Sequence, residues 1–449
     1  MTTTTHSSAD WLRPTTVTNF FLGFSGGLPF PLVYATLSAW LEEAGLTRSA
    51  ISTFAWIGFA YSFKFLWSPI VDNTRIPILT NWVGRRRAWL LTAQVALAMG
   101  LLVMSRLDPA TELAVFAMVT LAVALLSATQ DIVIDAYRIE SDSKEMQGIL
   151  AGAYQYGYRL ALICSSAGAL YLAEWGGWAL TYSLMAGLMG VGILAVLMSR
   201  EPAGTPTLSY TSAADWLQKS VFQPFFDMFS RFGGVLLLIL AYVLCFRVSD
   251  YVLGILANPF YLDLGFSKTD VANVAKAYGI VVSLVGIAAG SAAVLRWSVY
   301  RCLVIASVLI AATNLGFIYL AFQGPELSAL AVTISGDNFA MGFAGTVFIA
   351  YLAGLTNAKF TATQYALLSS LSAFGGKFLA KWSGNVQEWS GWSGLLAPWM
   401  TDAARDADWA GWVGFFGYAA LTGIPSVVLA LVIGLPRFRI ERLAESSNK

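Results

Sequence analysis

Residues 127–140 read SATQDIVIDAYRIE and end an apolar run that begins near Leu113 and is long enough to cross a bilayer. On an α-helix with about 3.6 residues per turn, polar residues three or four apart lie on one face. In this stretch those residues are Ser127, Asp131, Asp135 and Arg138. A carboxylate that faces hydrocarbon costs about 2.5–3.5 kcal/mol. The face must therefore contact protein or a water-filled cavity, and the remaining chain is expected to form its walls.

The composition is that of a polytopic α-helical membrane protein. The 449 residues are 57% hydrophobic and 12% charged, with a mean hydropathy of +0.65, whereas soluble domains carry about 25% charged residues. Apolar runs such as Leu421–Leu435 do not alternate with polar residues, which argues against a membrane β-barrel. The net charge of +1 predicts no nucleic-acid partner.

The residue types that most often bind metals or act as nucleophiles are scarce in this sequence. His6 is the only histidine, and it lies in a Thr-rich tail, so neither a multi-histidine metal site nor histidine-based catalysis within the spans is expected. The three cysteines, Cys164, Cys245 and Cys302, lie in apolar segments and are interpreted as small core residues. We expect no metal, no cofactor, no enzyme activity and no cleaved signal peptide.

Twelve spans are predicted from the apolar runs, since about 20 residues cross about 30 Å of hydrocarbon. They lie at 17–43, 48–72, 88–107, 112–138, 146–173, 178–199, 232–262, 268–296, 299–322, 326–357, 361–389 and 410–435. With an inner N-terminus, the loops and tails on the inner side hold seventeen Lys and Arg residues, and the outer loops hold four. This positive-inside asymmetry predicts that both termini are cytoplasmic.

The longest interior break separates six predicted spans from six. The expected domains are an N-terminal tail (1–16), a six-helix bundle (17–199), a cytoplasmic linker (200–231), a second six-helix bundle (232–435) and a C-terminal tail (436–449). Within the linker, residues 215–232 mix aromatic and charged side chains, which predicts an amphipathic helix at the inner membrane surface. This all-α, two-bundle layout is typical of major facilitator transporters.

Two features near the N-terminus allow a moving or a static interpretation. The first span carries glycines and prolines between Gly23 and Pro31, which suit either a bend that moves or close helix packing. Asp72 ends the second span, and Gly84–Arg87 follow, similar to the acidic and Gly-Arg-Arg signature of major facilitators. The basic loop is predicted to pair with Asp72 as an inner gate, or else only to set the topology.

Several strings together resemble the AmpG-type muropeptide permeases, a branch of the major facilitators. They are FLGFSGGLP (21–29), YSFKFLWSPIVD (61–72), GRRRAW (84–89), SATQDIVIDA (127–136) and TATQYALLSSLSA (361–373). The resemblance covers about residues 17–435. It implies proton-coupled import of anhydromuropeptides across the bacterial inner membrane for peptidoglycan recycling, with a connection to β-lactamase induction. Because related branches carry acyl-CoA or siderophores, another bulky anion remains the alternative cargo.

Charged residues inside the predicted spans point to a polar interior. They are Lys64, Asp131, Arg159, Arg247, Asp250, Lys276, Asp337, Lys377 and Lys381. Lys381 can reach outward, but the other eight would cost about 20–28 kcal/mol if unpaired. Each half repeats base, acid, base on its second, fourth and fifth spans, with Lys64, Asp131 and Arg159 followed by Lys276, Asp337 and Lys377. The excess of bases suits an anionic solute.

The site hypotheses follow from these charges. The predicted substrate-binding residues are Lys64, Gln130, Arg159, Arg247, Lys276, Lys377, Tyr154 and Tyr158. The predicted proton-coupling residues are Asp131, Asp337 and Asp250. The predicted gating residues are Asp72, Arg85, Arg86, Asp135 and Arg138. Ionised Asp131 is expected to pair with Lys64 or Arg159, and its protonation to free that base for the substrate.

Simpler interpretations remain open for several of these residues. Asp131 could only fix its helix in an ion pair, and Asp250 could only neutralise Arg247 one turn away. The aromatic residues could be helix-packing core. The outer loop 390–409 could be a lid or a solvated loop. We expect a monomer in the lipid bilayer and alternating access between the two bundles, which a passive channel would not need.

Overall fold

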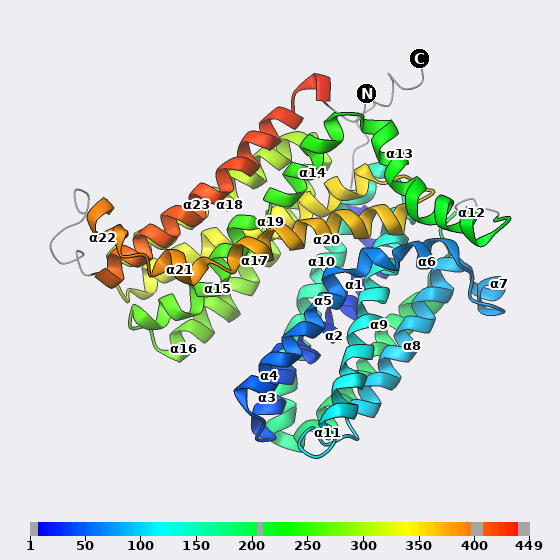
Figure 1. Cartoon of the computed structure of the whole chain (residues 1–449), viewed down its shortest axis with the longest axis horizontal. Coiled ribbons are helices and arrows are strands. Elements are labelled where there is room, and N and C mark those ends of the chain that lie inside the picture. The colour runs from blue at the N-terminus through cyan, green and yellow to red at the C-terminus, as the bar shows by residue number, and fades with distance from the viewer. Residues whose placement is uncertain (1–7, 204–209, 397–406, 439–449) are drawn as a thin grey trace. The chain divides into compact units, whose positions relative to one another are not determined.

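The computed structural model describes residues 8–203, 210–396 and 407–438, and these residues form helices and connecting turns (Figure 1). The predictions for His6, for residues 397–406 of the outer loop and for the tail beyond Phe438 lie outside them. Nine helices in the described ranges are long and apolar enough to span a membrane. Contacts divide the chain into two compact units, Met1–Phe226 with Leu352–Ser370, and Asp227–Tyr351 with Leu371–Lys449.

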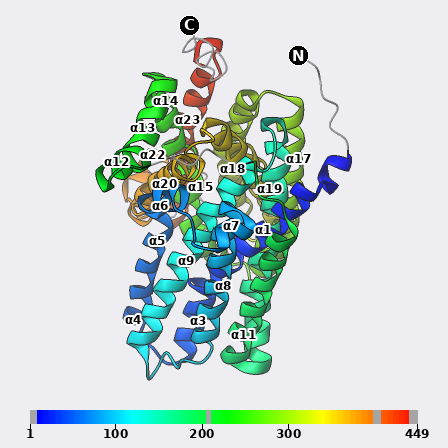
Figure 2. The same ribbon diagram turned by 90° about the vertical axis from the view of Figure 1, so that its right-hand side faces the viewer.

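The first unit contains the N-terminal helices. Up to the second predicted span they are η1 (Ser8–Leu12), α1 (Pro14–Gly27), α2 (Pro29–Leu32), α3 (Ala35–Glu43), α4 (Arg48–Thr53), η2 (Phe54–Gly58), α5 (Phe59–Ser62), η3 (Lys64–Leu66) and α6 (Ser68–Asn73). They continue with α7 (Leu79–Val83), α8 (Arg85–Met104), α9 (Leu113–Glu140), η4 (Lys144–Met146), α10 (Gln147–Ile163), η5 (Cys164–Gly168), α11 (Ala169–Met198), α12 (Ala213–Leu217) and η6 (Gln218–Phe222). Helices α8 and α9 run side by side (Figure 1 and Figure 2).

Close helix packing explains the glycines of the first span. A Cβ on Gly23 would lie 2.0 Å from the Tyr154 carbonyl oxygen, and one on Gly157 would lie 1.8 Å from the Phe20 carbonyl oxygen. Helices α1 and α10 therefore touch backbone to backbone, which confirms the packing interpretation. The chain also leaves helical geometry between α2 and α3, where Tyr34 has φ −130° and ψ −102°. Whether this interruption moves stays a prediction.

The predicted span at 48–72 is not one continuous helix, because α4, η2, α5, η3 and α6 divide this segment. Phe63 and Trp67 flank η3 with ψ values near zero. Pro69 has no amide hydrogen to donate to the Phe65 carbonyl, whose oxygen accepts the Ser68 hydroxyl at 2.9 Å instead. The predicted span 361–389 is likewise divided, since α20 (Thr361–Ala380) ends before α21 (Ser383–Gln387).

The predicted boundary between 173 and 178 is marked by Gly177 alone. Its φ of 76° interrupts an otherwise continuous helical stretch, Lys144–Met198. That stretch holds two of the predicted spans, while the two divided segments fall short as single helices. These differences account for nine long helices among the described residues where twelve spans are predicted.

The second unit holds most of the remaining helices. They are α14 (Val235–Cys245), α15 (Val248–Asp263), α16 (Lys268–Asp270), η7 (Val271–Tyr278), α17 (Gly279–Arg296), α18 (Val299–Gln323), most of α19 (Leu327–Leu355), the end of α20, α21, α22 (Gly391–Leu396), α23 (Ala407–Ile433) and η10 (Pro436–Phe438). Helix α13 (Gln223–Phe232) crosses the unit boundary. Helices α18 and α23 pack along their length (Figure 1), and Phe317 stacks on Phe416 with ring centroids 5.1 Å apart.

Candidate functional site

The polar face of α9 carries a buried chain of charges in the first unit. Lys64 Nζ lies 3.8 Å from Asp135 Oδ2, and Arg138 Nη2 lies 3.4 Å from Asp135 Oδ1. Lys64 sits on the short η3 turn, and the other two side chains lie one turn apart on α9. Asp135 is therefore shared between two bases, which balances part of its desolvation cost.

Asp131 lies one turn before Asp135, and among the described residues no ion pair joins it to a base. Its Oδ1 atom is buried and has no hydrogen-bond partner among the described residues. Of the two pairings expected for ionised Asp131, the one with Lys64 is not present among the described residues, since Lys64 Nζ is 3.8 Å from Asp135 instead. A buried carboxylate oxygen without a partner costs free energy, and binding a proton at the carboxylate reduces that cost.

Gln130 is fully buried and contacts α1 rather than a cavity. Its Oε1 accepts the Ser25 hydroxyl at 3.2 Å, and its Nε2 donates to the Ser25 carbonyl at 2.8 Å. Gln94 Nε2 donates to the same hydroxyl at 3.2 Å. In this structure the amide of Gln130, predicted to bind substrate, is used for packing α9 on α1.

Aromatic rings surround the Arg138 end of the charge chain. The guanidinium carbon lies 6.0 Å from the Tyr154 ring centre and 5.3 Å from that of Tyr365, within the range of cation–π attraction. Tyr154 and Tyr158 lie with centroids 5.9 Å apart. Arg159 on the same helix is partly buried. The structure therefore brings Tyr154 to the predicted gate residue Arg138.

A second charge cluster lies at the ends of α6, α8 and α9. Arg86 Nη2 contacts Asp72 Oδ1 at 2.7 Å and Glu140 Oε1 at 2.6 Å, and all three side chains are almost fully buried. Arg85 Nη1 donates to the Asp72 carbonyl at 2.6 Å. The predicted association of Asp72 with the basic loop is thus present in the structure. Glu140, which sequence reasoning missed, is the last residue of α9 and follows Arg138 by two positions.

Asp72 also contacts the first turn of α20. Its Oδ2 accepts the Thr363 amide at 2.8 Å and the Thr363 hydroxyl at 2.9 Å, and its Oδ1 lies 3.3 Å from the Ala362 amide. The first amides of a helix have no partner within the helix, and the helix dipole favours an anion there. The carboxylate therefore joins Arg86 to α20; we call Asp72, Arg86, Glu140 and Thr363 the latch.

Glu201 and Arg87 form a reciprocal clamp between α8 and α11. The Glu201 carboxylate accepts the amides of Arg86 at 2.8 Å and Arg87 at 3.0 Å. The Arg87 side chain donates to the carbonyls of Val196 at 2.9 Å and Leu197 at 3.0 Å. An anion thus caps one helix start and a cation caps one helix end. The sequence signal for Glu201 was its place directly after the end of a predicted span.

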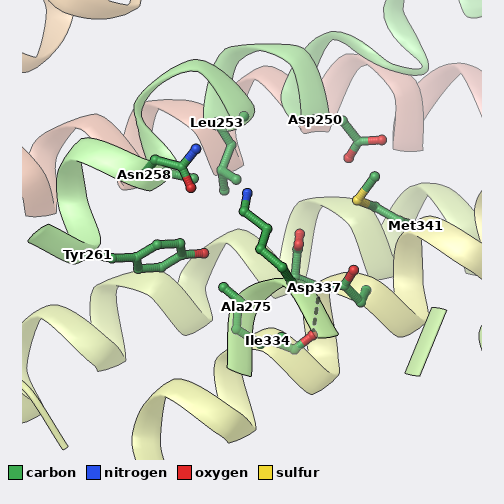
Figure 3. Close-up of a pocket in the computed structure, with 12 residues that line it drawn as sticks. Asp250, Leu253, Asn258, Tyr261, Ala275, Ile334, Asp337 and Met341 are labelled. Atoms are coloured by element: carbon green, nitrogen blue, oxygen red, sulfur yellow. Dashed lines mark hydrogen bonds between the residues drawn. The ribbon is translucent and has the colours of Figure 1, made fainter. Parts of the chain in front are cut away.

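The second unit has a pocket of about 210 Å³ lined by α15, η7 and α19. Asp250, Asn258 and Tyr261 come from α15, Lys276 comes from η7, and Asp337 comes from α19. Figure 3 shows Asp250, Asn258, Tyr261 and Asp337 around this space. Among the residues described, Asp337 has no ion-pair partner, whereas Asp250 lies 3.6 Å from Arg247. The predicted neutralisation of Asp250 by Arg247 is therefore present.

The local backbone of this pocket is irregular. Lys276 lies in a π-helical stretch, a feature often found at functional sites. Pro259 sits inside α15 between two pocket residues and removes one helical hydrogen bond. Asn338 donates to the Ile334 carbonyl at 3.2 Å (Figure 3). Lys276 and Lys377 are exposed in the structure, and Lys377 is not among the pocket residues.

The predicted site residues thus separate into two groups and a remainder. Lys64, Asp131, Asp135, Arg138 and Tyr154 gather in the first unit, and Asp250, Lys276 and Asp337 line the pocket of the second unit. Within the described ranges, no group of three His, Cys, Asp or Glu side chains is arranged to hold a metal ion.

Comparison with known proteins identifies the family. The model of the Major Facilitator Superfamily matches residues 15–380. The chain belongs to this superfamily. A Rickettsia felis transporter named AmpG 4 is 36% identical over 380 residues, which are 84% of this chain and 91% of that protein. The Anhydromuropeptide permease of Escherichia coli is 33% identical over 431 residues, which are 95% of this chain and 82% of that protein.

Solved structures agree with this assignment at the level of the fold. A major facilitator named FucP, in the outward conformation, superposes with a TM-score of 0.65 at 14% identity, covering 94% of this chain and 99% of that chain. The proton:xylose symporter XylE gives a TM-score of 0.63 at 13% identity, covering 97% and 98%. The family match and the nine apolar helices among the described residues make the chain a multi-pass membrane transporter of the major facilitator fold, and not an enzyme.

Proposed function

We propose that this transporter imports anhydromuropeptides across the bacterial inner membrane by proton symport, with both termini in the cytoplasm. The similarity to the Escherichia coli Anhydromuropeptide permease over 95% of the chain supports the substrate class. The seventeen-to-four distribution of basic residues supports the orientation. Import of this solute class would supply peptidoglycan recycling and β-lactamase induction. The transporter acts as a monomer.

The observation that carries the coupling proposal is the buried, unpartnered Oδ1 atom of Asp131 next to the Lys64–Asp135 pair. Protonated Asp131 needs no counter-ion, so Lys64 remains on Asp135. When Asp131 loses its proton, its charge attracts the Lys64 ammonium, and Asp135 keeps Arg138 alone. Exchange of Lys64 between two carboxylates on one face of α9 would thus convert proton transfer into movement of the η3 turn.

Substrate contacts are proposed mainly in the pocket of the second unit. Lys276 supplies a cation for a peptide carboxylate, and Asn258 and Tyr261 supply hydrogen-bonding groups for sugar hydroxyls and amides. Arg247 lies beside the pocket residue Asp250, and Arg159 and Lys377 are further bases for the anionic parts of the solute. Asp337 is the second candidate for the proton.

The latch is proposed as the inner gate. Opening requires Thr363 to leave Asp72, which exposes a carboxylate and the first amides of α20. Arg86 and Glu140 hold Asp72 in place throughout. Asp135 and Arg138, closer to the middle of α9, form a second layer of the gate. Alternating access then opens the site to one side of the membrane at a time.

Uptake by purified protein in lipid vesicles tests the substrate assignment. We expect labelled anhydromuropeptide to accumulate when the vesicle interior is alkaline, and unlabelled anhydromuropeptide to compete with it. Acyl-CoA and a ferric siderophore serve as unrelated bulky anions and should not compete. Accumulation of either control anion in place of the muropeptide would overturn the assignment, and the Lys276→Met variant should reduce uptake of the true substrate.

A further inference from the structure

The helical segment 213–232, formed by α12, η6 and α13, has three different sides. One side is buried against the protein and repeats every four residues, as Ser220, Pro224, Met228 and Phe232. A second side carries polar residues such as Gln223 and Ser230, which are exposed. The third side carries phenylalanines that are 51%, 43%, 69% and 62% exposed, namely Phe222, Phe225, Phe226 and Phe229. Four phenyl rings on one helix face are more than scattered surface apolar residues.

The charges of this segment cancel in pairs. Lys219 Nζ lies 2.9 Å from Asp215 Oδ2, and Arg231 Nε lies 2.9 Å from Asp227 Oδ2, each pair one turn apart. The hydrogen bond from Lys219 lowers the pKa of Asp215, so this carboxyl group is ionised at neutral pH. The segment holds no other charged residue. Its surface therefore has no net attraction for acidic lipids or other polyanions.

The position of the segment identifies what covers the phenylalanine face. Only Gly233 and Gly234 separate α13 from α14, which begins the candidate membrane span Val235–Asp263. Leu237 in the first turn of that span is 72% exposed, as an apolar side chain that faces lipid would be. An apolar helix face that leads directly into a spanning helix lies at the level of the bilayer surface.

We propose that Phe222, Phe225, Phe226 and Phe229 insert into the lipid bilayer and anchor this segment along the membrane plane. The occupant of the face is lipid acyl chain, and the insertion is apolar rather than electrostatic, since the charges cancel. The assignment to the inner leaflet rests on the proposed orientation of the transporter; the insertion itself does not.

The anchored helix contacts the segment that carries the latch. The Pro224 carbonyl accepts Gln364 Nε2 at 3.0 Å, and Gln364 Oε1 accepts the Asn357 amide at 2.8 Å. Gln364 follows Thr363, which donates to Asp72. Lipid insertion on one side of α13 thus holds the Pro224 carbonyl that positions the start of α20 on the other. Insertion into the bilayer would thus stabilise the contact between Thr363 and Asp72.

Spin labels on single cysteines test the insertion in the full-length protein in lipid vesicles. Cys164, Cys245 and Cys302 are first replaced by alanine. Labels are then placed by Phe225→Cys, Phe229→Cys and, as a matched control on the polar side of the same helix, Gln223→Cys. Relaxation by oxygen, which concentrates in lipid, is compared with relaxation by a water-soluble nickel chelate. Uptake of each variant is recorded separately.

We expect labels at 225 and 229 to be relaxed severalfold more by oxygen than by nickel, and the label at 223 to show the reverse. The pattern should be the same in vesicles of neutral lipid and of neutral lipid mixed with an acidic phospholipid. Equal nickel access at all three positions would overturn the proposal, because the face would then be in water. Shielding of 225 and 229 from both reagents would also overturn it, because protein would then cover the face. Neither readout needs a transported solute, so the outcome is independent of the proposed function.

Discussion

The charged face of α9 and the pocket lined by α15, η7 and α19 use the same residue types in opposite ways. In the first, Lys64 and Arg138 are held by Asp135 in a buried chain of ion pairs. In the second, Lys276 is exposed in the pocket and Asp337 has no ion-pair partner among the described residues. The two lysines at equivalent places in the chain therefore differ, because Lys64 is held in a buried ion pair and Lys276 is exposed in a pocket. This difference is the reason why we propose conformational coupling around Lys64 and solute contact around Lys276.

The largest effect on stability is expected at the latch, where the ion-paired side chains are the most deeply buried. Arg86→Met leaves Asp72 and Glu140 buried without their shared cation, which should cost about 3–5 kcal/mol of stability. The measurement is thermal unfolding of the purified protein in detergent. Arg247→Met is the control, since Arg247 is one-third exposed and lies 3.6 Å from Asp250. Equal destabilisation by both changes would contradict the distinction between buried ion pairs and partly exposed charges.

Glycine substitutions test the same comparison, because they add a methyl group either to a close helix contact or to the open pocket. Gly157→Ala would place a methyl group 1.8 Å from the Phe20 carbonyl oxygen, so α1 and α10 must separate at a cost of about 1–3 kcal/mol. Gly254 lines the pocket and has no atom within 4 Å of an added Cβ, so Gly254→Ala should leave the melting temperature unchanged or raise it. The added methyl should nevertheless raise the KM for the solute. A large loss of stability at 254 would mean that the pocket is not open space.

A smaller effect on stability is expected from the two equivalent lysines. Lys64→Met should cost about 1–3 kcal/mol, less than Arg86→Met, because Asp135 retains Arg138. Lys276→Met should change stability by less than about 0.5 kcal/mol, because the side chain is exposed. Uptake and unfolding measured on the same preparations separate the roles. If Lys276→Met lowered the stability of the protein but left uptake at the wild-type level, the pocket would not be the solute site.

The fold followed from the sequence to the extent that local hydropathy determines it. Apolar runs located the spans, and the break at Gly177 fell at the predicted boundary. The division of 48–73 into short helices was missed, since it depends on Pro69 and on which carbonyl the Ser68 hydroxyl contacts. Hydropathy has no signal for such local hydrogen bonds, and a hydropathic run is read as one helix.

The residues of the site could be listed from the sequence, but their partners could not. Asp131 and Asp135 lie on the same face of α9 about one turn apart, so helical spacing alone cannot decide which one Lys64 contacts. Gln130 appeared available because it neighbours Asp131, yet its amide is used on Ser25. Glu140 ends α9, and Glu201 follows the end of α11. The contacts of Glu140 with Arg86 and of Glu201 with the α8 amides depend on how the helices pack, which helical spacing does not show.

The most direct test of the central claim is proton-driven accumulation by the Asp131→Asn variant in vesicles, beside solute exchange at equal pH on both sides. Asparagine keeps the size of the side chain but neither binds nor releases a proton. The account predicts that accumulation driven by a pH gradient is lost while exchange of labelled for unlabelled anhydromuropeptide persists. Accumulation at the wild-type level would contradict it and would move the proton to another carboxylate, with Asp337 examined next by the same pair of measurements.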